Sequence, residues 1–165
     1  MKILEILGDN RDPSYTKKIE GCRGVLIRGG KILLSYETKI DQWLIPGGGL
    51  EAGESLQECC EREVAEEAGI RVNAHTQFLT LEEYYHEYYF RSNYFFCEYR
   101  GECDRNLTKS EIERGLEPRW IDFDEALKIF GSYADYEGKD EIRFGAYYRE
   151  YLALCEVRDY KRDDA

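Results

Sequence analysis

The chain has 165 residues, of which 42% are hydrophobic and 35% charged, which fits one globular domain with a buried core. Its formal net charge of −11 argues against sequence-independent binding to DNA, RNA or an anionic membrane, because those partners require a basic surface. The first residues contain no long apolar stretch, and no repeat or low-complexity linker interrupts the chain. We therefore expect a single cytoplasmic domain over 1–165, without a signal peptide or membrane span.

The first part of the chain alternates short apolar runs with glycine turns, a pattern that predicts β-strands. The strands expected here cover residues 2–7, 22–28, 31–37 and 42–47. Gly29 and Gly30 predict a hairpin between the second and third of them. Ser55 and Glu58 have the spacing of a capping box that opens a helix, and Gly69 stands where such a helix ends.

The second part begins with aromatic and β-branched residues that predict two further strands, over 71–87 and 88–102. A short strand over 118–123 and helices over 124–133 and 139–157 follow from the apolar periodicity. The sum is a mixed sheet flanked by helices, which is an α/β layered domain.

The helix after Ser55 carries an unusual set of carboxylates. At about 100° per residue, its apolar sector consists of Leu56, Cys60, Val64 and Ala68. Glu63 and Glu67 fall at the edge of that sector, where like charges repel and lose hydration. Together with Glu66 they form a group of oxygen ligands that suits a hard cation such as Mg²⁺. The alternative is an ordinary solvated helical face.

Three consecutive glycines, Gly47, Gly48 and Gly49, precede this helix, and Gly53 follows them closely. Glycine lets a ligand approach the main chain, and a glycine loop that opens onto a helix N-terminus is suited to phosphate. We therefore predict that the three glycines bind the phosphates of a substrate, although the same residues also suit a simple turn.

The stretch from Gly48 to Ile70 has the spacing G-x5-E-x7-R-E-U-x-E-E-x-G-U, where U is apolar. Its fixed positions are Gly48, Glu54, Arg62, Glu63, Val64, Glu66, Glu67, Gly69 and Ile70. This is the Nudix box, so the chain resembles the MutT-like Nudix hydrolases. The resemblance extends more loosely to the flanking strands, and it implies an α/β/α sandwich with a mixed β-sheet between helices over the single domain 1–165.

The resemblance also implies roles for the box residues. In this family the box forms a loop–helix–loop that binds Mg²⁺ or Mn²⁺ against a diphosphate. Glu63, Glu66 and Glu67 match the metal-binding glutamates, and Gly48 would add its backbone carbonyl. Glu54 and Arg62 match a mainly structural pair, in which Arg62 orients the glutamates.

Members of the family differ in the residue that acts as general base. Glu66 or Glu63 is the first choice here, because a carboxylate near the metal can take a proton from water. A glutamate outside the box is the alternative: Glu111 and Glu113 stand where some relatives have one, and Glu113 is preferred. Either residue could equally be a solvated surface charge.

The run over 83–96 holds many aromatic residues that could stack on a nucleobase. Tyr88 lies about as far beyond the box as a tyrosine of the dinucleoside-polyphosphate members, so it is our candidate substrate contact. Packing in the sheet or in a homodimer surface is the alternative. His75 and His86 have no motif around them and are interpreted as structural. The six cysteines are interpreted as free thiols.

The function implied by the resemblance is metal-dependent hydrolysis of a nucleoside diphosphate linked to another group X, such as a nucleoside triphosphate, with water attacking phosphorus. Dinucleoside polyphosphates are one specific alternative. A non-catalytic nucleotide-sensing module is another, and an isoprenoid diphosphate isomerase, which shares the fold and needs a catalytic cysteine, is a third. The expected partner is a small nucleotide diphosphate, and a homodimer is left open.

Overall fold

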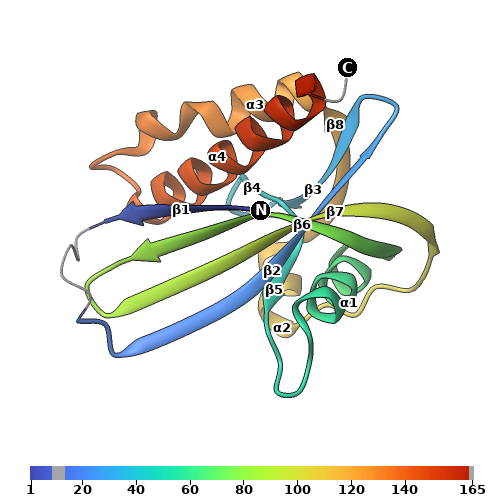
Figure 1. The fold of residues 1–165 in the computed structure, drawn as a ribbon, viewed down its shortest axis with the longest axis horizontal. Coiled ribbons are helices and arrows are strands. Elements are labelled where there is room, and N and C mark those ends of the chain that lie inside the picture. Colours follow the sequence, from blue (N-terminus) through green and yellow to red (C-terminus); the bar gives the residue numbers. More distant parts are fainter. Residues whose placement is uncertain (9–13, 164–165) are drawn as a thin grey trace. The chain divides into compact units, whose positions relative to one another are not determined.

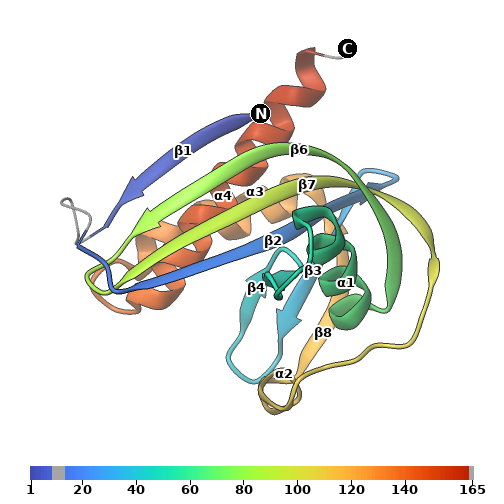
Figure 2. The same cartoon turned by 60° about the horizontal axis from the view of Figure 1, so that its bottom comes forward.

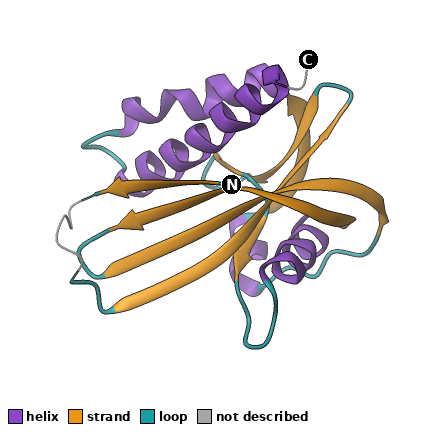
Figure 3. Ribbon diagram, in the orientation of Figure 1, coloured by secondary structure: helices purple, strands orange, loops and turns teal. Residues whose placement is uncertain are grey.

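A computed structural model describes residues 1–8 and 14–163. The chain folds into two compact units, one made of Met1–Leu26 and Pro46–Asn106, the other of Ile27–Ile45 and Leu107–Ala165. Strands and helices occur in both units (Figure 3). Strand β2 (Lys17–Arg28) runs from the first unit into the second, so the sheets of both units include part of it.

The first unit is a five-stranded mixed sheet with one helix. Its remaining elements are β1 (Lys2–Leu7), β5 (Gly47–Gly49), α1 (Leu56–Ala68), β6 (Ile70–Tyr84) and β7 (Tyr88–Glu102). The pairing order is β1-β6-β7-β2-β5, in which β1 is parallel to β6 and β7 is parallel to β2, while the other two pairs are antiparallel. Figure 2 shows the long strands side by side.

The second unit packs helices with a smaller antiparallel sheet. Its elements are β3 (Lys31–Glu37), β4 (Gln42–Leu44), α2 (Lys109–Arg114), β8 (Leu116–Asp122), α3 (Phe123–Gly131), the 3-10 helix η1 (Ser132–Tyr136) and α4 (Glu141–Asp163). Strand β3 pairs with the end of β2, with β4 and with β8. Helices α3 and α4 lie together (Figure 1), and the ring of Phe130 meets that of Tyr147 edge-on at 5.3 Å.

Helix α1 begins and ends where its sequence signals place it. Ser55 Oγ accepts a hydrogen bond from the Glu58 amide, and Glu58 Oε2 accepts one from the Ser55 amide, which completes the capping box. Gly69 ends the helix in the left-handed conformation, with φ 70°, and its amide donates to the Ala65 carbonyl. Both ends of the helix are therefore fixed before any ligand binds.

The underside of α1 rests directly on β2. A Cβ atom added to Gly24 would lie 2.5 Å from Val64 Cγ2 and 3.1 Å from Cys97 Sγ, so only glycine leaves room for the helix. Cys60 Sγ lies 3.8 Å from Cys97 Sγ in the same contact. Gly24 of β2 and Cys97 of β7 therefore face α1.

Because side chains alternate along a strand, this contact identifies the side of the sheet on which α1 lies, called here the α1 face. The register between β2 and β7 is unbroken from Lys17 opposite Tyr88 to Leu26 opposite Cys97. Strand β6 pairs with β7 in antiparallel register, so the β6 residues that stand opposite these β7 residues lie on the same face. The α1 face carries Lys18, Glu20, Cys22, Thr80, Glu82, Tyr84, Tyr89, Arg91 and Asn93.

The mixed α/β architecture expected from the sequence is confirmed, while the bounds of several elements differ from those expected. Strand β2 starts at Lys17 rather than at 22, because its first half pairs with β7. Gly47–Gly49, expected as a turn, pairs with β2 as a strand. The short helix α2 was not expected. Among the described residues, no helix is long and apolar enough to span a membrane.

Candidate functional site

The glycine strand β5 lies against α1. Gly48 stands opposite Cys22 and Gly49 opposite Gly21 in the antiparallel pairing. A Cβ atom added to Gly48 would lie 2.5 Å from Glu63 Oε2 and 2.6 Å from its Cδ. The loop therefore touches the carboxylate of Glu63, and glycine at this position is what permits the contact.

The three box glutamates differ in exposure. Glu63 and Glu67 are buried, with 8% and 7% of their surface exposed, while the side chain of Glu66 keeps 32%. Glu63 and Glu66 meet at Arg62, whose Nη1 donates to Glu63 Oε1 at 2.7 Å and to Glu66 Oε2 at 3.2 Å. Helix α1 thus holds carboxylate oxygens at the edge of the core, beside the glycine loop.

Arg62 also binds Glu54 and the loop. Its Nε donates to Glu54 Oε1 at 2.7 Å and its Nη2 to Glu54 Oε2 at 3.0 Å, which is a bidentate pair. The same Nη2 donates to the Gly49 carbonyl at 2.9 Å. One guanidinium therefore joins the glycine loop, the loop before the helix and two box glutamates.

This pairing controls the protonation of Glu54. The hydrogen bonds from Arg62 lower the pKa of Glu54 from 4.5 to about 2, and the carboxylates in turn raise the pKa of Arg62. A folded-state pKa below the unfolded one means that ionised Glu54 stabilises the fold above pH 4.5. That contribution is lost as the pH falls from 4.5 towards 2.

The variant Glu54→Gln is therefore expected to lower the free energy of unfolding by about 1–2 kcal/mol at pH 7, discounted because the pair is partly exposed to solvent. The difference from wild type should shrink between pH 4.5 and 2, since protonated Glu54 is as neutral as glutamine. Urea denaturation of both proteins at several pH values measures it. A difference that stays constant down to pH 2 would contradict the assignment.

The donor chemistry at this site fits a divalent cation. Carboxylate oxygens of Glu63, Glu66 and Glu67 and the Gly48 carbonyl are the hard ligands that Mg²⁺ and Mn²⁺ accept. Within residues 1–8 and 14–163, no three acidic, histidine or cysteine side chains already stand in a metal-binding geometry. At α1, Arg62 donates to oxygens of both Glu63 and Glu66. Those oxygens would have to turn from the guanidinium towards an ion.

Tyr88, the tyrosine predicted to contact substrate, is not brought to the box. It lies on the side of the sheet opposite α1, stacked on Phe90 with ring centroids 5.7 Å apart. Lys17 Nζ lies 5.0 Å from the centre of the Tyr88 ring and donates to its hydroxyl. The neighbouring Tyr89 is on the α1 face, because a shift of one residue along a strand changes the side of the sheet.

The glutamates proposed outside the box belong to the second unit. Glu111 caps α2, where its Oε2 accepts a hydrogen bond from the Thr108 amide at 2.7 Å. Glu113 lies two residues later with 65% of its side chain exposed, and its carboxylate is 3.8 Å from Lys109 Nζ. Both carboxylates thus contact groups of α2 and its cap, as expected of solvated helix residues.

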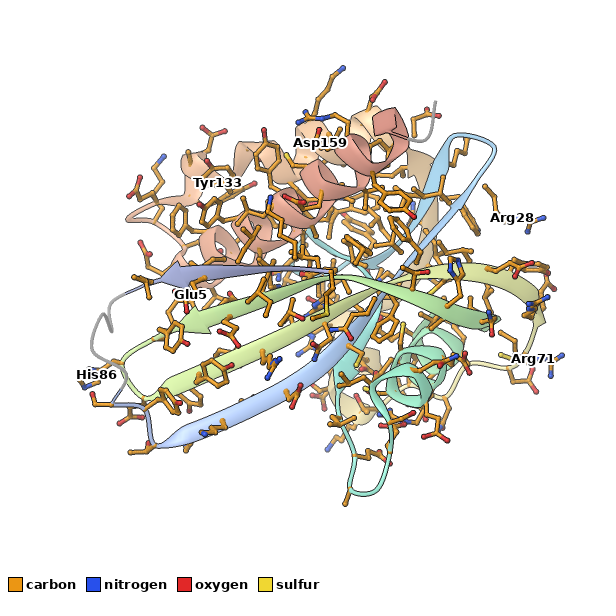
Figure 4. The ribbon with its side chains drawn as sticks, viewed as in Figure 1. Glu5, Arg28, Arg71, His86, Tyr133 and Asp159 are labelled. Carbon is orange, nitrogen blue, oxygen red and sulfur yellow. The ribbon has the colours of Figure 1, made fainter. Side chains whose placement is uncertain are left out.

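The histidines make local contacts, and one cysteine, Cys59, lies at the box with its Sγ 3.9 Å from the Gly48 carbonyl. His86 lies at the turn between β6 and β7, at the far end of these strands from α1 (Figure 4). His75 Nδ1 is 2.8 Å from the hydroxyl of its neighbour Thr76. All six cysteines are free thiols, and Cys59 and Cys60 are buried under α1 as expected.

Comparison with known proteins finds one matching family model, described as NUDIX domain, over residues 20–141. Curated relatives include Nudix hydrolase 4 of Arabidopsis thaliana, which is 30% identical over 70% of this chain and 55% of its own length. An uncharacterized Nudix hydrolase of Bacillus subtilis, YvcI, is 36% identical over 36% of each chain. The match thus spans about half of one relative and a third of the other.

Among solved structures, a NUDIX hydrolase from Nitrosomonas europaea superposes with a TM-score of 0.58. The superposition covers 89% of this chain and 90% of that protein, at 20% sequence identity. At that identity the likeness is one of fold.

Proposed function

The chain belongs to the Nudix family, and from that premise we propose that it is a pyrophosphohydrolase that acts on a nucleoside diphosphate linked to a further group X. Members of this family generally use divalent metal ions. The proposal includes dependence on Mg²⁺ or Mn²⁺ and a single working domain over residues 1–165. The family match supports one domain, because residues 20–141 draw on both compact units.

The observation that carries the proposal is the contact between the glycine loop and the box carboxylates. Gly48 can lie against the carboxylate of Glu63 only because it lacks a side chain, and that carboxylate is buried and held by Arg62. Buried carboxylates gathered in this way are costly without a cationic partner. Arg62 balances part of the charge, and a divalent cation would balance the rest.

A bound cation supplies two kinds of chemistry: it neutralises charge on the diphosphate, and it makes a water more acidic. The chain supplies the rest. The backbone amides of Gly47, Gly48 and Gly49 bind and orient the phosphates, and Arg62 holds the box glutamates in position.

A box glutamate takes the proton of the attacking water. We propose Glu66 for this role, because it is the most exposed of the three and can reach a solvent molecule. Glu63, which Arg62 holds at 2.7 Å, is the alternative within the box. Glu113 of α2 is the alternative outside it.

The test is a panel of nucleoside triphosphates, nucleotide sugars, ADP-ribose and dinucleoside polyphosphates, incubated with the wild-type protein and Mg²⁺. The proposal expects a nucleoside monophosphate together with pyrophosphate or a phosphorylated remainder, identified by chromatography. Binding of a nucleotide without turnover would instead favour a sensing module. Turnover of an isoprenoid diphosphate alone would favour an isomerase.

A further inference from the structure

A mixed group of charges lies on the α1 face of the sheet, outside the Nudix box. Arg91 of β7 stands between Glu20 of β2 and Glu82 of β6, because each of these is its direct neighbour in the strand register. Arg91 Nε is 3.7 Å from Glu20 Oε1 and 3.8 Å from Glu82 Oε1. These three residues are called the Arg91 cluster.

The Arg91 cluster is not fully satisfied internally. The distances from Arg91 Nε to Glu20 Oε1 and to Glu82 Oε1 are both longer than a hydrogen bond. Among the residues that the structure describes, the buried Nε of Arg91 has no hydrogen-bond partner. The two carboxylates are held from elsewhere: Asn93 Nδ2 donates to Glu20 Oε1 at 3.0 Å, and the Tyr89 hydroxyl donates to Glu82 Oε1 at 2.8 Å. The Arg91 side chain as a whole is 38% exposed, so the cluster presents one guanidinium and two oriented acceptors.

Three tyrosines lie next to the Arg91 cluster and are called the tyrosine triad. Tyr15 stacks on Tyr89 with ring centroids 5.0 Å apart and an interplanar angle of 24°. Tyr84 meets Tyr89 at 5.2 Å and Tyr15 at 6.2 Å. All three are half-buried, so aromatic surface remains accessible beside the charged groups.

Strand register places the cluster close to the glycine loop. The Leu50 amide donates to the Glu20 carbonyl at 2.9 Å, and Gly48 stands opposite Cys22. Strands β5 and β7 flank β2, so at about 3.3 Å per residue and about 4.8 Å per strand Arg91 lies roughly 12 Å and Tyr89 roughly 16 Å from Gly48. A nucleoside whose phosphate is held by the glycine loop can span this interval.

We propose that the Arg91 cluster and the tyrosine triad bind the base of the substrate and select bases with a lactam edge, which is a ring N–H beside a carbonyl. This inference rests on the proposed hydrolase function. The guanidinium of Arg91 donates to the carbonyl oxygen, while the carboxylate of Glu82 or Glu20 accepts from the ring N–H. The triad stacks on the base.

The same geometry disfavours adenine and cytosine. Their ring nitrogen at the corresponding position is an acceptor, and it would face a carboxylate without a proton between them. Guanine, hypoxanthine, uracil and thymine all carry the lactam edge. Selection by this mechanism depends on the edge and not on whether the base is a purine or a pyrimidine.

Two pairs of nucleotides that differ only at this edge test the proposal: inosine against adenosine triphosphate, and uridine against cytidine triphosphate. The wild type is expected to show a higher kcat/KM for the lactam member of each pair, by roughly 10- to 100-fold. Arg91→Met and the double variant Glu20→Gln with Glu82→Gln should each bring the ratio towards one. Arg100→Met is the matched control, since Arg100 is an exposed arginine of the same strand paired with Glu98 at 2.9 Å, and it should keep the wild-type ratio.

Equal kcat/KM within both pairs for the wild type would overturn the inference, as would variants that fold, by circular dichroism, and keep the full ratio. If the wild type hydrolyses no nucleotide, the hydrolase proposal fails separately. Calorimetric titration with inosine and adenosine monophosphates then decides the inference. Tighter binding of inosine monophosphate by about tenfold or more supports it, and equal affinity or no binding overturns it.

Discussion

The variant Glu67→Gln is expected to hydrolyse its best nucleotide with a kcat/KM about 100-fold or more below that of the wild type. Replacing a residue that only supports a metal ligand costs about 10- to 100-fold, so loss of a ligand should cost at least the upper figure. Glutamine keeps the volume of the buried side chain and removes its charge. Stability should therefore be kept, and the loss should appear as weaker activation by Mg²⁺.

Glu58→Gln is the matched control for that experiment. Glu58 lies on the same helix, is exposed, and acts in the capping box, in which glutamine also serves. Its kcat/KM should stay within about twofold of the wild type, as is usual for surface changes that keep local contacts. Undiminished activity of Glu67→Gln would contradict the assignment of Glu67 as a metal ligand, whatever the activity of the control variant.

The second large effect is expected from Gly48→Ala. The added Cβ would lie 2.5 Å from Glu63 Oε2, so the carboxylate has to move. Because the clash is with the flexible end of a side chain, the midpoint of thermal unfolding should change little. We expect kcat/KM to fall roughly 10²-fold or more, since misplacement of a catalytic group by about 1 Å can cost that much.

Gly49→Ala tests whether any added side chain in β5 lowers the activity, or only one that displaces Glu63. An added Cβ at Gly49 meets no atom within 4 Å, and the residue is exposed. Because no protein atom has to move, the loss of kcat/KM in this variant measures only obstruction of the phosphates by the added methyl group, and it should be smaller than the loss in Gly48→Ala. Equal losses in the two variants would show that the contact between Gly48 and Glu63 is not what makes the loop functional.

Helix α1 could be predicted closely because its signals are local. Ser55, Glu58 and Gly69 determine its two ends through contacts within a few residues. Helix α2 has the same kind of signal, in Thr108, Glu111 and Gly115, and could have been predicted from it. With six residues, α2 is too short to show an apolar periodicity, so only the capping residues indicate it.

The parts that could not be predicted depend on pairing between distant segments. Gly47–Gly49 is a strand because Gly21–Arg23 lies beside it, and nothing in the glycines themselves indicates that partner. Tyr88 and Tyr89 are adjacent in sequence, and only the register with β2 decides which of them faces α1. Arg91 meets its glutamates through two strand pairings, which no spacing in the sequence reveals.

The most direct test of the proposed function is the rate of nucleoside monophosphate release by the wild-type protein, measured with Mg²⁺, after chelation, and after Mg²⁺ is restored. The account predicts that hydrolysis of the diphosphate stops with the chelator and returns with the cation. The same rate with and without chelator would contradict the claim that the carboxylates of Glu63, Glu66 and Glu67 hold a cation needed for the reaction.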